Sequence, residues 1–210
     1  METQELALLA VDALKQAYPD ALCSLDYQDP LQLLISTRLA AQCTDARVNL
    51  VTPALFARFP TLEAFCEGTE EEIGQLIHSC GFYKTKSKDI LAACRKIRDD
   101  FGGQVPDNME DLLSLPGVGR KTANLILGDI FHKPAVVTDT HCIRISGRLG
   151  LTKNTAPQKV EKDLRDVLPP EDSNDFCHRL VLHGRAVCTA RKAHCETCCM
   201  AGFCSKTGVQ

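Results

Sequence analysis

The spacing of apolar residues predicts helices along most of this 210-residue chain. Near the N-terminus, apolar residues recur every three or four positions, as on one face of a helix, at Leu6, Leu9, Ala13 and Leu14. Nowhere does the strict alternation of apolar and polar residues that predicts a strand compete seriously. We therefore expect an all-α protein, with further helices over residues 45–58, 61–67, 84–100, 119–131, 139–149, 157–167 and 173–186.

Several helix boundaries are marked by local residue chemistry. Asp29-Pro30 predicts a helix start, because an aspartate caps free backbone amides and a proline fits the first turn. Thr69-x-x-Glu72 and Asp107-x-x-Glu110 both fit the capping-box pattern. Loops are expected at residues 102–103, 116–117, 132–134 and 169–170. No internal repeat or low-complexity tract breaks this arrangement.

Composition and charge narrow the class of protein. With 44% hydrophobic and 5% aromatic residues, the chain reads as an ordinary globular protein of one large or two small domains. No apolar run approaches the roughly 18 residues of a membrane span. The net charge of -3 argues against a nucleic-acid partner, but residues 176–210 hold five bases against one acid. A folded chain could present a basic face, although solvated charges on separate helices explain the balance as well.

Four cysteines near the C-terminus have the spacing Cys188-x6-Cys195-x2-Cys198-x5-Cys204. The segment is too short for a hydrophobic core, so we expect a metal centre, whose binding supplies folding free energy. Disulfides are a weaker alternative, because the N-terminal sequence lacks the basic and apolar regions of a signal peptide. Since only Cys195 and Cys198 form a short hook, the spacing leans towards iron-sulfur but leaves zinc open. We take Cys198 as the ligand and Cys199 as a spare thiol.

The segment Leu115-Pro116-Gly117-Val118-Gly119-Arg120-Lys121 predicts a tight turn between two helices. Pro116 ends the first helix, and the two glycines allow positive φ angles and close approach of another backbone. Amides exposed at the start of the second helix would favour an anion such as a DNA phosphate. A plain connection between helices is the alternative for Gly-x-Gly alone, but the whole segment has the helix-hairpin-helix signature.

Lys121 falls in the first turn of the second helix. A lysine with its usual pKa of about 10.4 is almost never neutral at pH 7. Partial burial and the positive end of the helix dipole would disfavour the ammonium, leaving an amine that can form a Schiff base. The alternative is a cation that only contacts phosphate.

The segment Val136-Val137-Thr138-Asp139-Thr140-His141 is an apolar stretch that ends in a carboxylate. Asp139 reads as the N-cap of a helix carrying Arg144 and Arg148, and capping is the simplest role for it. A short helix and a return loop can also bring it near Lys121, where a carboxylate could support charge development and proton removal.

Together, residues 115–121, 137–141 and 182–185 and the cysteine spacing resemble the endonuclease III family, over essentially the whole chain. The family contains bifunctional DNA glycosylases and abasic-site lyases of base excision repair. The resemblance implies a six-helix barrel domain over residues 22–133. It also implies a cluster domain made of residues 1–21 and 134–210, with DNA lying across the cleft between the two domains.

The resemblance also implies residue roles. Lys121 would be the Schiff-base nucleophile and Asp139 the catalytic carboxylate. Gln42 would fill the gap left by an extruded base, and Phe82 would act as a wedge on the opposite strand; without the resemblance, an exposed helix end and a core aromatic are the simpler readings. The other implied DNA-binding residues are Leu115, Gly117, Val118, Gly119, Arg120, His141, Arg144, Arg191 and Lys192. A 4Fe-4S cluster would be held by Cys188, Cys195, Cys198 and Cys204.

The family reading gives a glycosylase-lyase acting on double-stranded DNA with oxidised pyrimidines or abasic sites. A monomer in the cytoplasm, associated with the nucleoid of a prokaryote and without a membrane partner, is expected. Residues 36–40 are more polar than is frequent in the family and Phe82 stands where leucine is common, so the preferred base stays open. An adenine glycosylase is a rival, but that branch generally lacks the lysine and carries an extra domain. A non-catalytic iron-sulfur DNA-binding or redox-sensing module is the other rival, and Lys121 distinguishes it.

Overall fold

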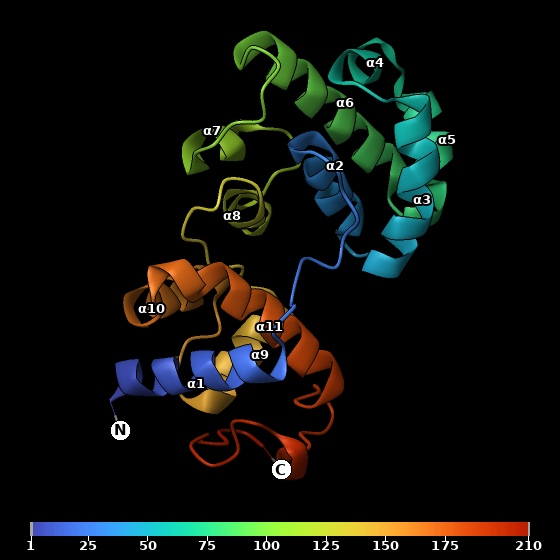
Figure 1. Cartoon of the computed structure of the whole chain (residues 1–210). Helices are drawn as coiled ribbons and strands as arrows, with labels where there is room; N and C mark the ends of the chain where they lie inside the picture. The colour runs from blue at the N-terminus through green and yellow to red at the C-terminus, as the bar shows by residue number, and fades with distance from the viewer. Residues whose placement is uncertain (1, 210) are drawn as a thin grey trace. The chain divides into compact units, whose positions relative to one another are not determined.

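The structure is a computed structural model that describes residues 2–209. Every regular element among them is helical, and the one extended pairing is an isolated bridge from Cys188 to Ala193 (Figure 1). The all-α prediction is therefore confirmed. In chain order the α-helices are α1 (Thr3–Ala17), α2 (Pro30–Ala40), α3 (Asp45–Arg58), α4 (Leu62–Glu67), α5 (Glu70–Ile77), α6 (Tyr83–Asp100), α7 (Met109–Ser114), α8 (Arg120–Asp129), α9 (Thr140–Leu149), α10 (Pro157–Val167) and α11 (Ser173–Ala186). The 3-10 turns are η1 (His78–Cys80), η2 (Pro170–Asp172) and η3 (Cys195–Thr197).

Two of the predicted helix starts form as expected. The Asp29 carboxylate accepts a hydrogen bond of 2.8 Å from the backbone N–H of Gln32, at the start of α2. At the start of α5, Thr69 and Glu72 each accept from the other's backbone N–H, at 3.2 and 3.0 Å. These caps satisfy amides that have no partner inside the helix.

Two other expectations are wrong. The capping box at Asp107 does not form; instead Asn108 caps α7 and accepts from the N–H of Asp111 at 3.0 Å. Asparagine caps as well as aspartate, so the neighbouring residue serves the same role one position later. Leu9 is 40% exposed, because the buried face of α1 is formed by Leu6, Ala7, Ala10, Val11 and Leu14.

The described residues form two compact units. The central unit, Ser24–Phe131, contains α2 to α8. Its longest helix, α6, packs on α4 and α5, while α8 packs on α2 and α7 (Figure 1). Phe59 and Phe65 stack with ring centroids 5.0 Å apart, and burying such a side chain stabilises a fold by about 1.5–3 kcal/mol. Further fully buried core residues of this unit are Leu33, Leu39, Leu55, Ile73, Ile77, Ile97 and Leu112.

The terminal unit combines the residues up to Cys23 with those from His132 onward. Its helix α11 packs on α1 and α9, and α10 packs on α1. The cysteine-rich segment follows α11 along the chain. Its fully buried core residues include Leu14, Val136, Val160, Leu164, Phe176 and Leu180.

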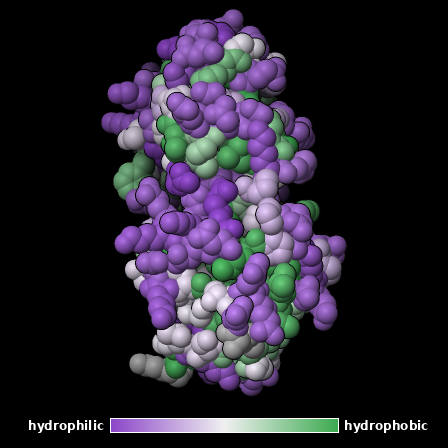
Figure 2. Space-filling view, turned by 90° about the vertical axis from the view of Figure 1, so that its left-hand side faces the viewer, coloured by the Kyte–Doolittle hydropathy of each residue, from purple (hydrophilic) through white to green (hydrophobic). Residues whose placement is uncertain are grey.

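The molecular surface is mostly polar on the face seen in Figure 2, where hydrophilic residues surround small hydrophobic patches. Among the residues that the structure describes, no helix is long and apolar enough to cross a membrane.

Candidate functional site

The predicted turn joins α7 to α8 in the central unit. Leu115 follows the last residue of α7, and its carbonyl accepts a hydrogen bond of 3.1 Å from the N–H of Val118. Gly117 has a φ of 74°, in the left-handed region that favours glycine. Gly119 is the N-cap of α8 and has no side chain to cover the first-turn amides. Those amides can therefore bind an anion, which the helix dipole also favours.

Gly117 is required by its surroundings as well as by its φ angle. A Cβ atom there would lie 2.7 Å from Nε of Arg38 and 2.9 Å from Cβ of Asp89. These two side chains, one from α2 and one from α6, form an ion pair at 2.6 Å. The turn packs against this ion pair. Gly119 differs from Gly117, because its φ is -101° and a Cβ there would meet no atom within 4 Å.

Exposure separates the residues of this turn. Gly117, Gly119, Arg120 and Lys121 are exposed, and Val118 is half-buried. Leu115 is only 2% exposed, so its side chain belongs to the core and only its backbone can reach a ligand. The partial burial expected for Lys121 is not found, because its side chain is exposed in the first turn of α8.

Gln42 and Phe82 both stand in loops with left-handed backbone. Gln42 is exposed with a φ of 54°, and Phe82 is 65% exposed with a φ of 49°. Non-glycine residues adopt this conformation rarely, and it clusters at functional sites. The simpler reading of Phe82 as a core aromatic is therefore wrong.

Lys86 holds these two loops in place, and the sequence gives no sign of it. It is 1% exposed, and its Nζ donates to the carbonyl of Leu39 at 2.7 Å and of Cys80 at 2.9 Å. The first carbonyl lies shortly before Gln42 and the second shortly before Phe82. Burial lowers the pKa of the Lys86 ammonium, and the neighbouring Cys43 and Cys80 oppose this effect.

Asp139 caps α9 in the terminal unit, as predicted. Its carboxylate accepts from the N–H of Cys142 at 2.7 Å, and the side chain is half-buried. The segment that precedes Asp139, residues 135–138, is buried. Within it, the N–H of Val137 donates to Sγ of Cys177 at 3.3 Å. Asp139 is thus held on a rigid segment. Lys121 belongs to the central unit and Asp139 to the terminal unit.

His141 and Arg144 lie on the first turns of α9. Nη2 of Arg144 is 3.1 Å from Nδ1 of His141 and donates to the carbonyl of Cys188 at 2.9 Å. Burial lowers the pKa of the Arg144 guanidinium. Gly184 leaves room for both side chains, since a Cβ there would lie 2.9 Å from Arg144 and closer still to His141. Arg144 therefore joins α9 to the end of α11, a structural role that the sequence did not suggest.

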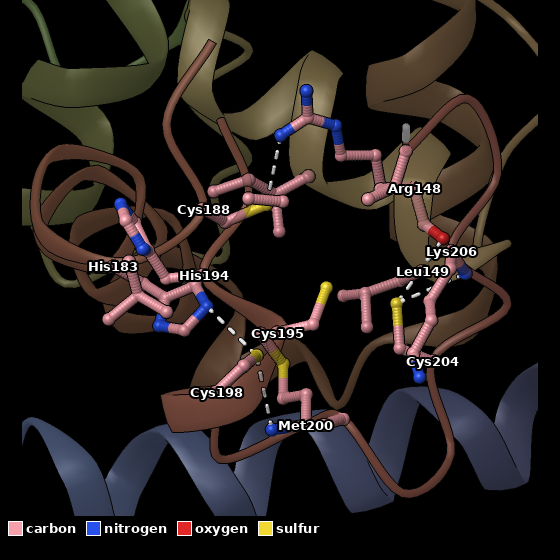
Figure 3. A pocket seen from close by; sticks show the side chains of 15 residues that line it. Arg148, Leu149, His183, Cys188, His194, Cys195, Cys198, Met200, Cys204 and Lys206 are labelled. Carbon is pink, nitrogen blue, oxygen red and sulfur yellow. Dashed lines mark hydrogen bonds between the residues drawn. The ribbon is translucent and has the colours of Figure 1, made fainter. Parts of the chain in front are cut away.

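Sulfur atoms from four cysteines line a common cavity in the terminal unit: Cys188, Cys195, Cys198 and Cys204 (Figure 3). Apolar side chains from α9 and from the segment after α11 complete its wall, among them Ile145, Leu149, Val187 and Met200. Cys199 is exposed, and it is not among the described residues that line this cavity.

Hydrogen bonds converge on three of the four sulfurs. Nη1 of Arg148 donates to Cys188 at 3.2 Å, and the backbone N–H of Met200 donates to Cys198 at 3.4 Å. The N–H of Lys206 donates to Cys204 at 3.3 Å. Such donors stabilise thiolates, the form in which cysteine binds metal.

The donor set fits an iron-sulfur cluster in chemistry and in placement. Burial raises the pKa of the Cys204 thiol, and the other three sulfurs raise it further, so a cationic centre would relieve a repulsion already present. Between residues 2 and 209, no three His, Cys, Asp or Glu side chains are grouped so that they could hold a metal ion as they stand. The fit therefore rests on the shared cavity and the donors to sulfur.

Arg191 and Lys192 are both exposed, on the loop between Cys188 and Cys195. The loop is closed by the bridge from Cys188 to Ala193, and the N–H of Lys192 donates to Oγ1 of Thr189 at 3.0 Å. The two cations are thus presented to solvent by a compact turn.

Not every base in residues 176–210 adds to a cationic surface. Arg179 is 6% exposed and donates to the carbonyl of Tyr18 and to Asp175. The sequence balance of five bases therefore overstates the charge that this segment can offer to an anionic partner.

Comparisons with known proteins agree with this arrangement. Residues 35–170 match the family described as HhH-GPD superfamily base excision DNA repair protein. Endonuclease III of Synechocystis sp. (strain ATCC 27184 / PCC 6803 / Kazusa) is 55% identical over 192 residues, which are 91% of this chain and 88% of that protein. Endonuclease III of Bacillus subtilis (strain 168) is 39% identical over 92% of this chain and 89% of that protein.

Solved structures are similar over nearly the whole chain. A trapped endonuclease III–DNA covalent intermediate and a non-covalent endonuclease III–DNA complex each have 37% identity and a TM-score of 0.91. Each match covers 98% of this chain and 97% of the other. A thermostable thymine-DNA glycosylase, 23% identical with a TM-score of 0.88 over 97% of both chains, shares the fold.

Proposed function

Because this chain belongs to the endonuclease III family of base excision DNA repair proteins, we propose that Lys121 is the nucleophile of its glycosylase and lyase reactions. The family shows that the protein is a DNA glycosylase and abasic-site lyase. The observation that carries the residue assignment is the exposed amine of Lys121 in the first turn of α8, directly after the Gly117 turn.

The proposed reaction needs an amine beside the sugar of a flipped nucleotide. Nζ of Lys121 attacks C1′, the bond from C1′ to the base breaks, and the base leaves with the bonding electrons. Opening of the sugar gives a Schiff base, and β-elimination then breaks the bond from C3′ to oxygen. A site that only bound a DNA phosphate would need no amine at this position, because backbone amides and any cation can bind phosphate.

We assign Asp139 the carboxylate role. Its oxygen accepts from a backbone N–H and the side chain is half-buried, so the carboxylate is held in one orientation. A carboxylate so held stabilises developing positive charge on the sugar and assists removal of a proton from the attacking amine.

DNA contacts follow from the exposed features of each unit. The amides of Gly117 to Gly119 would bind a phosphate, with Arg120 beside them. Gln42 and Phe82 would fill the space left by an extruded base, since extrusion costs a few kcal/mol that inserted side chains partly offset. In the terminal unit, Arg191 and Lys192 would contact phosphates, and His141 and Arg144 would support the start of α9.

We propose that Cys188, Cys195, Cys198 and Cys204 hold a 4Fe-4S cluster. Such a cluster supplies folding free energy to a segment with little core of its own. Its ligands Cys188 and Cys195 would fix both ends of the loop that carries Arg191 and Lys192. Oxidised pyrimidines are the proposed bases, in duplex DNA, together with pre-formed abasic sites.

Strand cleavage of a duplex with one abasic site tests this assignment. Lys121→Arg keeps a cation at the position but removes the nucleophilic amine, and Lys121→Gln removes both. Both variants should bind the duplex within a few-fold of the unchanged protein and lose cleavage. Cleavage by Lys121→Arg at the unchanged rate would show that the residue acts only as a cation.

A further inference from the structure

Two cysteines stand beside the two residues assigned to the space of the extruded base. Cys43 directly follows Gln42, and Cys80 precedes Phe82 by two positions. The charge of Cys43 and its side-chain hydrogen bonding help burial to raise the pKa of the Cys80 thiol. The two cysteines are therefore neighbours in space although they come from separate loops of the central unit.

The backbone around this pair is held in a fixed position by Lys86. Its Nζ donates to the carbonyls of Leu39 and Cys80, and the N–H of Cys43 donates to the carbonyl of Ala40 at 3.1 Å. The end of α2 and the turn η1 are thereby tied to one buried ammonium. Cys80 and the end of α2 that leads to Cys43 therefore lie on backbone that one side chain fixes.

The two thiols differ in access. Cys43 is half-buried, whereas Cys80 is 2% exposed. Burial raises the pKa of Cys80 to about 11, while the positive charges of Lys86 and Arg47 act in the opposite direction. Cys43 is thus the thiol that an oxidant reaches, and Cys80 is the thiol in position to react next.

A second pair in the chain shows why access matters. Cys177 likewise raises the pKa of the Cys142 thiol, through side-chain hydrogen bonding and its charge, but the two residues are 0% and 2% exposed. An oxidant in solution reaches neither of them. This pair is an internal comparison for the Cys43–Cys80 pair.

We propose that Cys43 and Cys80 are an oxidative modification site, which a peroxide converts into a reversible disulfide. The Cys43 thiolate attacks one peroxide oxygen, the O–O bond breaks, and Cys43 becomes a sulfenic acid. The Cys80 thiol loses its proton as its sulfur attacks the Cys43 sulfur, and the hydroxide that leaves takes up that proton. In total, two thiols and one hydrogen peroxide give one disulfide and two waters, and a dithiol reductant reverses the change.

The consequence for DNA rests on the proposed function. A disulfide has an S–S bond of about 2.05 Å, shorter than any contact between two thiols, so its formation draws the two loops together. It also removes the freedom of Gln42 and Phe82 to separate around an extruded base. Oxidised protein should therefore bind a duplex with an abasic site more weakly, by several-fold, and undamaged duplex about as before.

Peptide mapping of the full-length protein tests the bond itself, independently of activity. The protein is treated with hydrogen peroxide, its remaining thiols are alkylated, and it is digested with trypsin without reduction. The expected product joins residues 39–47, with Cys43, to residues 59–84, with Cys80, and it disappears with dithiothreitol. The second peptide also contains Cys66, so a Cys66→Ser variant must keep the product and a Cys43→Ser variant must lose it.

Two outcomes would overturn the site: Cys43 recovered as a sulfinic acid beside an alkylated Cys80, or a Cys142–Cys177 product formed instead. Cys43→Ser changes a half-buried residue, so loss of the product cannot be ascribed to an unfolded core; circular dichroism checks this. Binding of oxidised and reduced protein to the abasic duplex then tests the consequence. A disulfide with unchanged binding overturns the consequence alone, and absence of cleavage by the reduced protein counts against the proposed function alone.

Discussion

The guanidinium of Arg38 and the carboxylate of Asp89 form an ion pair at 2.6 Å directly beneath the turn that precedes α8. Both side chains are only about one-fifth exposed, at 18% and 23%. Arg38 lies within the polar stretch of α2, residues 36–40. The pair gives Arg38 a structural role, because both side chains of the pair pack against Gly117.

Replacing Gly117 by alanine should disturb the packing of the turn against the Arg38–Asp89 ion pair. The new Cβ would clash with Arg38, and a φ of 74° is unfavourable for alanine, so we expect a loss of about 1–3 kcal/mol in the free energy of unfolding. Gly119→Ala is the matched control for stability, because its Cβ would meet no atom within 4 Å. Urea unfolding of both variants measures the difference, and equal stabilities would show that the turn is not constrained as described.

Lys86 should make stability depend on pH. Its folded pKa lies below the unfolded value of 10.5, so between these two values the unfolded chain binds more protons. The contribution of Lys86 to stability therefore rises as pH increases through the window below 10.5. Cys80, whose pKa is raised by burial, gives the opposite slope, so the informative quantity is the difference from a Lys86→Met variant.

This variant should also be less stable by about 1–3 kcal/mol at neutral pH, because two buried carbonyls lose their donor. Urea midpoints between pH 8 and roughly 10.5, the unshifted lysine value, measure both effects. Parallel curves for the two proteins would mean that burial does not favour the neutral form of Lys86.

The assignment of Cys198, and not Cys199, as a cluster ligand predicts different iron contents for variants at these two adjacent residues. Cys198 lines the cavity and accepts from the N–H of Met200, whereas Cys199 is exposed. Cys198→Ser should therefore lose bound iron and visible absorbance, while Cys199→Ser should keep both. Iron and sulfide analysis of the purified proteins checks this, and iron retained only in Cys198→Ser would reverse the assignment.

If Arg191 and Lys192 contact DNA phosphates, removing their charges should weaken binding to damaged and undamaged DNA alike. Exchanging Arg191 and Lys192 for glutamate should weaken DNA binding about equally for damaged and undamaged duplexes. The slope of log K against log salt should become shallower by roughly one to two units, as fewer counterions are released. Titrations at several salt concentrations measure this slope, and a loss confined to damaged duplexes would rule out simple phosphate contacts.

Most helix boundaries could be predicted because they depend on neighbours in sequence. Asp29 and Thr69 cap the helices they were expected to cap, and helices such as α3 and α10 have the expected bounds. The misplaced cap at Asp107 arose because Asn108 offers the same chemistry one residue later. Propensity alone cannot decide between two adjacent capping residues.

The contacts that hold the site could not be predicted, because they depend on tertiary packing. Lys86 sits in a helix segment rich in lysine that reads as a surface, and yet it is buried against two carbonyls. The family resemblance implies a DNA contact for Arg144, and in the structure its guanidinium contacts His141 and donates to the carbonyls of Gly184 and Cys188. In both cases these carbonyl partners lie outside the helix that carries the donor.

Covalent trapping on an abasic duplex tests the role of Lys121 most directly. Borohydride reduces a Schiff base to a stable carbon–nitrogen bond, so the unchanged protein should become linked to DNA, and peptide mapping should place the link on Lys121. Asp139→Asn should still be trapped on this substrate, because the base is already gone. Lys121→Arg should bind the duplex but form no adduct; an adduct that persists in Lys121→Arg, or that maps to another amine, would contradict the proposed mechanism.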